Sequence, residues 1–291
     1  LYPVLARSNV TVVVNTHVDK LALSGTKVTG VHINRAGVQS LVGANTEVII
    51  CSGGINTPKL LMLSGIGDDA QLRQHGIKTV VDAKQVGKNF QDHLLHGGCI
   101  FEPKEHIPHR NSAANAAGFL KSNAKLAAPD VNIVQIELPY SSDVVAKQYS
   151  PPGTSWALCA GLVAPKSRGE IKLRSADPKD RPIVDARFLS HPDDVKALAF
   201  GIEVSREIGN SAGMKDFVKR EVAPGKKLQG KEMEDFVRNG ATTYFHQSGT
   251  CRMGKDTDAV VDAQLRVNGV QGLRIADSSI MPRIASVATM A

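Results

Sequence analysis

The stretch TEVIICSGGINTPKLLMLSGIG, from Thr46 to Gly67, most constrains how the chain can fold. Its first part is a short apolar run ending in two glycines, as in a buried strand of a mostly parallel sheet. Thr57 is then predicted as a helix N-cap, Pro58 as the first helical residue and Gly65 as the helix stop. A strand, a glycine turn and a short helix in this order predict an α/β unit.

The segments on either side extend this pattern. Residues 10–33 read as strands that are broken at Ser24–Gly25 and at Gly30, because glycine marks turns. Near the other end, GLRIADSSIMP predicts a short buried strand that ends at Asp277. Open α/β sheets place ligand-contacting residues at such strand ends, so Asp277 is a candidate site residue.

The middle of the chain, from about Phe101, has a different character. The segments PDVNIVQIELPY, SWALCAGLVAP and GEIKLRSA read as strands spaced by proline and glycine turns. They predict an antiparallel sheet and a second domain. Helices are predicted over residues 191–211 and 230–240, each ending at a glycine.

Composition excludes several classes of protein. The chain has 291 residues, with 42% apolar and 22% charged residues, which is ordinary for a soluble globular protein. The net charge of +7 raises the question of nucleic acid, but acids interrupt the basic residues and aromatic residues do not accompany them. We therefore expect no nucleic-acid partner. The four cysteines are far apart and form no CxxC pair, which favours a reducing, cytoplasmic setting over a zinc site or disulfide framework.

Motifs of common enzyme classes are absent from the sequence. It has no GxGxxG after a strand, no GxxxxGK[ST] loop, and GTSWA does not match GxSxG. The segment YFHQSGTCRMG holds His246 after two aromatic residues, with glycines soon after it. An arbitrary histidine is more often a structural residue. We read His93 and His96 in that structural way, since HxxH without a placed carboxylate is a weak metal motif, and we expect no metal.

Five segments, in the same order, resemble the glucose–methanol–choline (GMC) family of flavin oxidoreductases. The similar segments are GGINTPKLLMLSGIG (Gly53 to Gly67), VGKNFQDH (Val86 to His93), residues 167–194, HQSGTCRMG, and LRVNGVQGLRIADSSIMP. The resemblance implies an α/β fold, with part of an FAD-binding doubly wound (Rossmann-like) domain and an antiparallel-sheet substrate domain with helices. The expected division is 1–100 for FAD binding, 101–243 for substrate binding, and 244–291 for a return to the FAD-binding domain.

The resemblance also assigns a role to His246. In the family the histidine of this motif faces the flavin N5, so His246 is expected to act as the base when an alcohol loses a hydride to FAD. The family usually adds a second His or Asn, and here Ala288 of SVATMA takes that place. Either His246 works alone, another group reaches in, or the protein is a divergent member.

Cofactor contacts follow from the same resemblance, although plain sheet packing is the alternative for each. They are expected at Val18 for the adenine, at Gly53 and Gly54 for the nucleotide, at Asp277 and Ser278 for the pyrophosphate and ribityl chain, and at Thr289 and Met290 for the isoalloxazine.

The expected function is oxidation of a small alcohol to an aldehyde or ketone, with FAD as cofactor and an unknown electron acceptor. Because the family's GxGxxG unit precedes the first matched segment, the chain is expected to be a fragment whose partner is the missing amino-terminal half. Two alternatives remain open. One is a hydroxynitrile-lyase-like member that uses His246 without net redox, and the other is a non-catalytic fragment that lacks the dinucleotide cradle.

Overall fold

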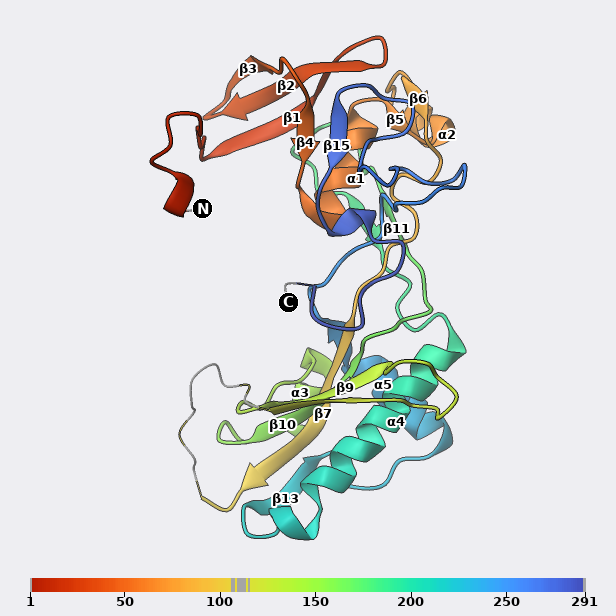
Figure 1. Cartoon of the computed structure of the whole chain (residues 1–291). Coiled ribbons are helices and arrows are strands. Elements are labelled where there is room, and N and C mark those ends of the chain that lie inside the picture. Colours follow the sequence, from red (N-terminus) through yellow and green to blue (C-terminus); the bar gives the residue numbers. More distant parts are fainter. Residues whose placement is uncertain (1, 106–107, 109–113, 115, 290–291) are drawn as a thin grey trace. The chain divides into compact units, whose positions relative to one another are not determined.

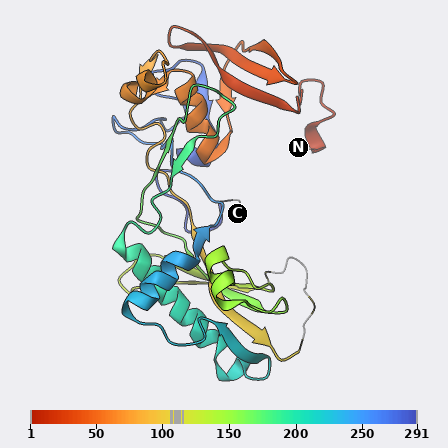
Figure 2. The same ribbon diagram turned by 180° about the vertical axis from the view of Figure 1, so that it is seen from behind.

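The computed structural model describes residues 2–105, 108, 114 and 116–289, and Figures 1 and 2 show the chain from opposite sides. The chain divides into two compact units, and each unit is assembled from three separate segments. Unit 1 contains Leu1–Asn89, Glu170–Asp185 and Gly249–Pro282, whereas unit 2 contains Phe90–Gly169, Ala186–Ser248 and Arg283–Ala291. The boundary predicted at residue 100 differs from this division because it falls inside strand β7 (Leu94–Pro103) of unit 2.

Unit 1 begins with a three-stranded antiparallel sheet of β1 (Thr16–Ser24), β2 (Lys27–Arg35) and β3 (Val38–Gly43). The predicted turn at Ser24–Gly25 is confirmed, but the break predicted at Gly30 is wrong because β2 runs through it. A Cβ atom at Gly30 would lie 2.2 Å from the carbonyl oxygen of Val42 in β3. Gly30 therefore permits a close approach between two strands and does not mark a turn.

The strand–helix element predicted around Gly53 forms the centre of unit 1. Strand β4 (Val48–Ile50) pairs in parallel with β15 (Leu273–Ile275), and helix α1 (Gly53–Leu63) follows β4 (Figure 1). Gly65 ends the helix with φ +82°, as predicted. The remaining elements of unit 1 are η1 (Tyr2–Val4), β5 (Ile66–Gly67), α2 (Asp69–Gln74), β6 (Val81–Asp82), β11 (Glu170–Lys172), β12 (Ile183–Asp185) and η3 (Ser278–Ile280).

The start of α1 differs from the prediction. The helix begins at Gly53 after Ser52, so Thr57 is not its N-cap and Pro58 lies inside the helix. A proline has no N–H to donate to the carbonyl four residues earlier, which here belongs to Gly54. The hydroxyl of Thr250 donates to that carbonyl oxygen over 2.7 Å and replaces the missing bond.

Unit 2 contains the predicted antiparallel sheet. The strand order is β13-β7-β10-β9-β8, and β14 also pairs with β7. The strand GEIKLRSA was expected in this sheet, but β11 pairs with β12 in unit 1, where the Ile171 N–H donates to the Gly87 carbonyl. The elements of the sheet are β7, β8 (Ala116–Leu120), β9 (Val131–Ile136), β10 (Trp156–Leu162), β13 (Val218–Ala223) and β14 (Ala241–Thr243).

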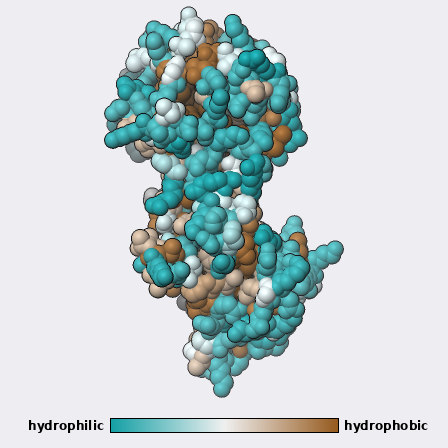
Figure 3. Space-filling model, turned by 90° about the vertical axis from the view of Figure 1, so that its right-hand side faces the viewer, coloured by the Kyte–Doolittle hydropathy of each residue, from teal (hydrophilic) through white to brown (hydrophobic). Residues whose placement is uncertain are grey.

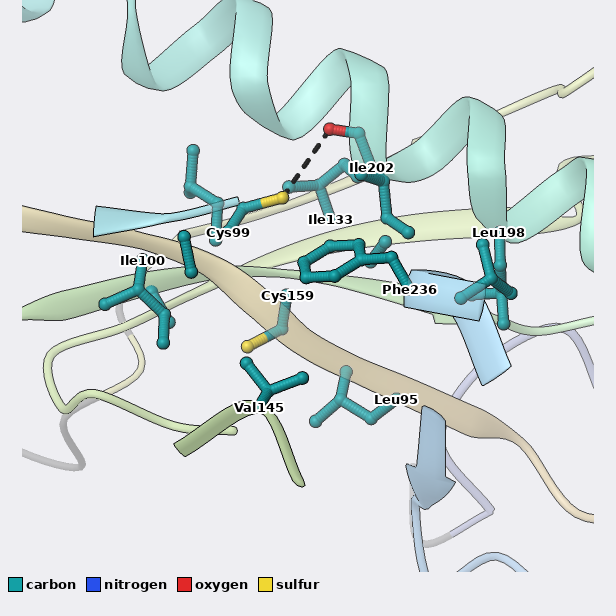
Figure 4. Close-up of a cluster of buried hydrophobic side chains, with 14 of the residues drawn as sticks. Leu95, Cys99, Ile100, Ile133, Val145, Cys159, Leu198, Ile202 and Phe236 are labelled. Carbon is teal, nitrogen blue, oxygen red and sulfur yellow. Dashed lines mark hydrogen bonds between the residues drawn. The ribbon is translucent and has the colours of Figure 1, made fainter. Parts of the chain in front are cut away.

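Helices pack against the sheet of unit 2 and close its core. The predicted helices correspond to α4 (Pro192–Gly209) and α5 (Gly230–Gly240), and the unit also holds α3 (Asp143–Tyr149) and η2 (Ala212–Met214). Figure 4 shows Leu198 and Ile202 of α4 facing buried side chains that include Cys99 and Phe236. The Cys99 thiol contacts the Ile202 carbonyl at 3.6 Å, and burial raises its pKa. Cys99 is therefore a packing residue, not a reactive thiol.

The face shown in Figure 3 is largely polar. Hydrophilic residues cover most of the face in Figure 3, and hydrophobic residues gather in smaller areas. Within the described part of the chain, no helix combines the length and the apolar character needed to cross a membrane.

Gly209 provides a test of the packing in unit 2. A Cβ atom at this position would lie 2.0 Å from Cζ of Phe101, so Gly209→Ala should overpack the core and lower the free energy of unfolding by about 1–3 kcal/mol. Fluorescence of the single tryptophan, Trp156, whose ring stacks on Phe101, reports urea unfolding of this unit. In the control Gly153→Ala the added Cβ meets no atom within 4 Å, and a loss as large as that of Gly209→Ala would contradict this packing.

Candidate active site

His246 is positioned by the pairing of β14 with β7. Thr243 lies opposite Leu94, and the Tyr244 N–H donates to the His93 carbonyl oxygen over 2.9 Å. This register places the segment that contains His246 beside Asp92 and His93. The pairing resumes further along, where Gln91 and Ser248 form an antiparallel bridge.

The backbone next to His246 adopts an unusual conformation. Phe245 has φ +62°, which is uncommon for a non-glycine residue, and its side chain is 75% exposed. The Thr243 hydroxyl accepts a hydrogen bond from the Phe245 N–H over 2.9 Å and holds this turn. Strained conformations of this kind concentrate at functional sites, which is consistent with a site here.

Asp92 holds the chain on both sides of this turn. Its carboxylate is buried and accepts from the His246 N–H over 2.8 Å, from the Thr243 hydroxyl, and from the Gln247 amide over 3.1 Å. Burial raises the pKa of Asp92, and these hydrogen bonds oppose the shift. A single carboxylate therefore fixes the backbone of His246 and its neighbours.

The side chain of His246 meets that of His93. Their Nδ1 atoms lie 3.0 Å apart, the ring planes are nearly perpendicular, and Nε2 of His93 lies 2.8 Å from the Ala285 carbonyl oxygen. His93 is only 1% exposed, and its burial lowers its pKa to about 4. Burial also lowers the pKa of the half-buried His246, while the charge of Asp92 opposes this shift. Both rings are therefore neutral near pH 7, and a neutral imidazole can accept a proton.

The sequence predicts a structural role for His93 and does not indicate the contact between the two histidines. The two residues are 153 positions apart, and β14, which brings them together, has only three residues. His96, by contrast, lies in the core and its Nε2 donates to the Phe236 carbonyl over 2.9 Å, which agrees with a structural role.

A second cluster of predicted residues lies in unit 1, at the start of α1. Oδ2 of Asp277 accepts from the Gly53 N–H over 3.0 Å and from the Thr57 hydroxyl over 2.6 Å, and Oδ1 accepts from the Ser279 N–H over 2.8 Å. The Thr57 hydroxyl in turn accepts from the Ser52 N–H. Asp277 therefore ties the end of β15 to the start of α1.

Gly53 fits the close approach of a cofactor, whereas Gly54, the other predicted glycine, is buried. Gly53 has φ +76°, and a Cβ atom there would meet nothing within 4 Å, so this backbone borders open space. The Ser52 side chain does not cap α1, and the Asp277 carboxylate already accepts from the Gly53 N–H. The start of a helix favours negatively charged groups such as this carboxylate or a phosphate. The open space beside the Gly53 backbone therefore leaves room for part of a phosphate-bearing cofactor.

The other predicted cofactor residues are distributed over both units. Val18 lies in β1 with an exposed side chain, and the Ser278 carbonyl accepts from the Gly249 N–H over 3.1 Å. Thr289 is half-exposed in unit 2, whereas Met290 lies outside the described residues. These cofactor contacts remain predictions. Among the residues that the structure describes, no group of three or more His, Cys, Asp or Glu side chains is arranged to hold a metal ion.

Comparisons with known proteins agree with this architecture. Two models described as GMC oxidoreductase match residues 1–95 and 165–291. An oxygen-dependent choline dehydrogenase of Brucella anthropi is 36% identical over 98% of the chain, and an alcohol dehydrogenase (acceptor) of Pseudomonas putida is 35% identical over 98%. The crystal structure of pyridoxine 4-oxidase from Mesorbium loti superposes with a TM-score of 0.91 at 31% identity, and covers 99% of the chain.

The chain combines an α/β unit with an antiparallel-sheet unit that carries the histidine motif. It belongs to the GMC oxidoreductase family, which confirms the resemblance and the fold class predicted from the sequence. The chain spans 56% of the length of both curated relatives and of the pyridoxine oxidase structure.

His96 predicts a pH dependence of stability. Burial lowers its pKa from 6.5 to about 4, so between these values the unfolded chain binds a proton that the folded chain does not. Unit 2 should lose stability as the pH falls from 6.5 to 4, with His96 contributing roughly 3 kcal/mol at 1.36 kcal/mol per pKa unit. Urea unfolding followed by Trp156 fluorescence should show a shallower pH slope for His96→Leu. An unchanged slope would contradict the assignment, and His75→Leu in unit 1 serves as control.

Thr57 tests the junction in unit 1. Thr57→Val keeps the shape of the side chain but removes the hydroxyl shared by Ser52 and Asp277. We expect a loss of about 1–3 kcal/mol of stability, because polar groups at the junction lose their partner. Hydrogen–deuterium exchange at the Ser52 amide should accelerate. The exposed Thr46→Val is the matched control, and equal exchange in the two variants would argue against this bonding.

Proposed function

We propose that the chain is the substrate-domain and base-carrying part of an FAD-dependent oxidoreductase that converts a small alcohol to an aldehyde or ketone. The observation that carries this proposal is the neutral, half-buried His246, held at a strained turn by Asp92. Relatives named choline dehydrogenase and alcohol dehydrogenase support this class of reaction. A formate oxidase of Aspergillus oryzae, whose structure was studied for modification of its FAD, supports the cofactor (TM-score 0.86, 29% identity).

The proposed alcohol oxidation requires the protein to supply a base and to hold the reacting groups in a fixed geometry. Oxidation of an alcohol removes a hydride from carbon and a proton from the hydroxyl, and His246 would accept that proton. FAD, when bound, supplies the hydride acceptor. The side chain of Ala288 offers no hydrogen bond to the substrate, so His246 would work without the second His or Asn that the family usually supplies.

Gly53 and Gly54 at the start of α1 are the proposed backbone neighbours of the nucleotide, and Asp277 would act mainly by shaping that backbone. Its two carboxylate oxygens are engaged with Gly53, Thr57 and Ser279. Val18, Ser278, Thr289 and Met290 complete the proposed set of cofactor residues.

The proposed partner is the GxGxxG-containing portion that the family resemblance implies. Unit 1 supports this idea because β3 and β4 expose the apolar side chains of Val38, Leu41, Val42 and Ile49. In addition, the two-stranded parallel pair β4–β15 is small for an independent sheet. Large exposed apolar side chains of this kind occur on surfaces that another part of a protein covers.

The function can be tested with a chimera that places the portion of the Brucella anthropi choline dehydrogenase that this chain does not match ahead of this chain. We expect a yellow protein whose flavin absorption bleaches when a primary alcohol is added anaerobically. His246→Asn should retain the flavin but slow this reduction by about 10²–10⁴-fold, the usual contribution of general base catalysis. His75→Asn in unit 1 is the control and should reduce at the parental rate.

Three results would count against the proposal. A chimera that folds but binds no flavin would contradict the cofactor assignment. Flavin that no alcohol reduces would contradict the reaction, and cleavage of a cyanohydrin without flavin reduction would favour a lyase. Equal reduction rates for the parent and His246→Asn would remove His246 as the base.

A further inference from the structure

We propose that His93 is a positioning residue that fixes His246 in one tautomer, with hydrogen on Nδ1, so that Nε2 carries the lone pair that receives the substrate proton. The inference rests on the proposed function for the identity of the base. The tautomer itself follows from a row of four atoms: the Ala285 carbonyl oxygen, Nε2 and Nδ1 of His93, and Nδ1 of His246.

The carbonyl oxygen of Ala285 sets the order of donors along this row. A carbonyl oxygen can only accept, so Nε2 of His93, at 2.8 Å, must carry the hydrogen. A neutral imidazole has one N–H, and Nδ1 of His93 is then an acceptor. Nδ1 of His246, at 3.0 Å, must therefore donate, which leaves the lone pair of His246 on Nε2.

The other arrangements are unfavourable. Two backbone groups, of Ala285 and Val163, lie close enough to the His93 ring to affect its pKa, but among the backbone groups of the described residues only the Ala285 carbonyl meets hydrogen-bond geometry with the ring. If His93 carried its hydrogen on Nδ1, its Nε2 lone pair would face the Ala285 carbonyl oxygen at 2.8 Å without a hydrogen between them. If His93 carried both hydrogens, a cation would be buried at 1% exposure against the ring of His246. If His246 carried its hydrogen on Nε2, two Nδ1 lone pairs would face each other at 3.0 Å.

The surroundings of His246 leave Nε2 available. The ring of Tyr244 lies against His246, with ring centroids 4.9 Å apart, and the Asp92 carboxylate bonds the backbone N–H of His246. Across residues 2–105, 108, 114 and 116–289, no hydrogen bond engages Nε2 of His246. The nitrogen that His93 leaves unprotonated is thus the one that a substrate hydroxyl could reach.

The reaction balances with this assignment. The hydroxyl proton would move to Nε2 of His246 as the carbon–oxygen double bond forms, and FAD, when bound, would supply the acceptor for the hydride that leaves the carbon. His246 then bears a positive charge, and its Nδ1–H bond to His93 becomes charge-assisted and stronger. His93 therefore helps most when the charge develops, which is what catalysis requires. His93 also contacts Nδ1 of His246 in a chain where Ala288 takes the place of the family's second His or Asn.

Nuclear magnetic resonance of the chain labelled with ¹⁵N in its histidines tests the tautomer without FAD or turnover. Long-range ¹H–¹⁵N correlations distinguish a protonated, pyrrole-type nitrogen from an unprotonated, pyridine-type one. At neutral pH we expect pyrrole-type Nδ1 and pyridine-type Nε2 in His246, and the reverse in His93. Pyrrole-type Nε2 in His246 of the parent chain overturns the proposal, whatever the variants do.

Three variants separate positioning from a general structural effect. His93→Leu removes the acceptor, and the two ring nitrogens of His246 should move toward averaged, intermediate positions. His93→Asn keeps an acceptor oxygen near the place of Nδ1 and should restore the parental pattern. His96→Leu, which alters an equally buried histidine three positions along the same segment, should leave His246 unchanged. An unaltered His246 spectrum in a folded His93→Leu chain overturns the proposal.

The same variants in the chimera link the tautomer to the reaction. Flavin reduction should slow by about 10²-fold in His93→Leu, the lower end of general base catalysis, with little change in the alcohol KM. The histidine spectrum could be as expected while no alcohol reduces the flavin of the chimera. This result would support the tautomer and contradict only the proposed function. The expected spectrum with an unaltered reduction rate in His93→Leu would overturn the positioning role.

Discussion

The backbone pairing of β14 with β7 is the interaction on which the histidine site depends. Three residue pairs, continued by the bond from Tyr244 N–H to the His93 carbonyl, fix the register of two segments that are far apart in sequence. A shift by one residue would turn every side chain to the other face of the strand. With the observed register, Asp92 bonds the backbone of His246 and the two imidazoles meet edge to face. The core formed by α4 and the sheet holds β7 in place beneath them.

Much of the fold could be predicted because local patterns sufficed. The strand before Gly53, the helix stop at Gly65 and the long helix α4 follow from apolar periodicity and from capping residues. The errors arose where a distant segment overrode the local pattern. Gly30 reads as a turn until β3 is placed beside it, and Pro58 is compatible with a helix interior only because Thr250 supplies the missing donor. Neither partner is visible within a short window of sequence.

The candidate site shows more clearly that a local sequence pattern does not identify distant partners. The family motifs identified His246 and Asp277, but they did not indicate what each residue contacts. Asp277 turned out to serve the start of α1 through Gly53 and Thr57, and His93 turned out to contact His246. A carboxylate and an imidazole can each be assigned several roles from sequence. Only the placement of their hydrogen-bond partners selects among these roles, and this depends on tertiary register.

The division of each unit into three chain segments has a practical consequence for dissecting the protein. The backbone passes between the units at residues 89/90, 169/170, 185/186, 248/249 and 282/283. Truncating the chain from either terminus therefore removes residues from both units before either unit stands alone. Expressing either unit by itself would require a rewired gene, with its three pieces joined by new linkers in place of the excised connections. A single proteolytic cut at any of these crossings would likewise leave the two units joined through the other four.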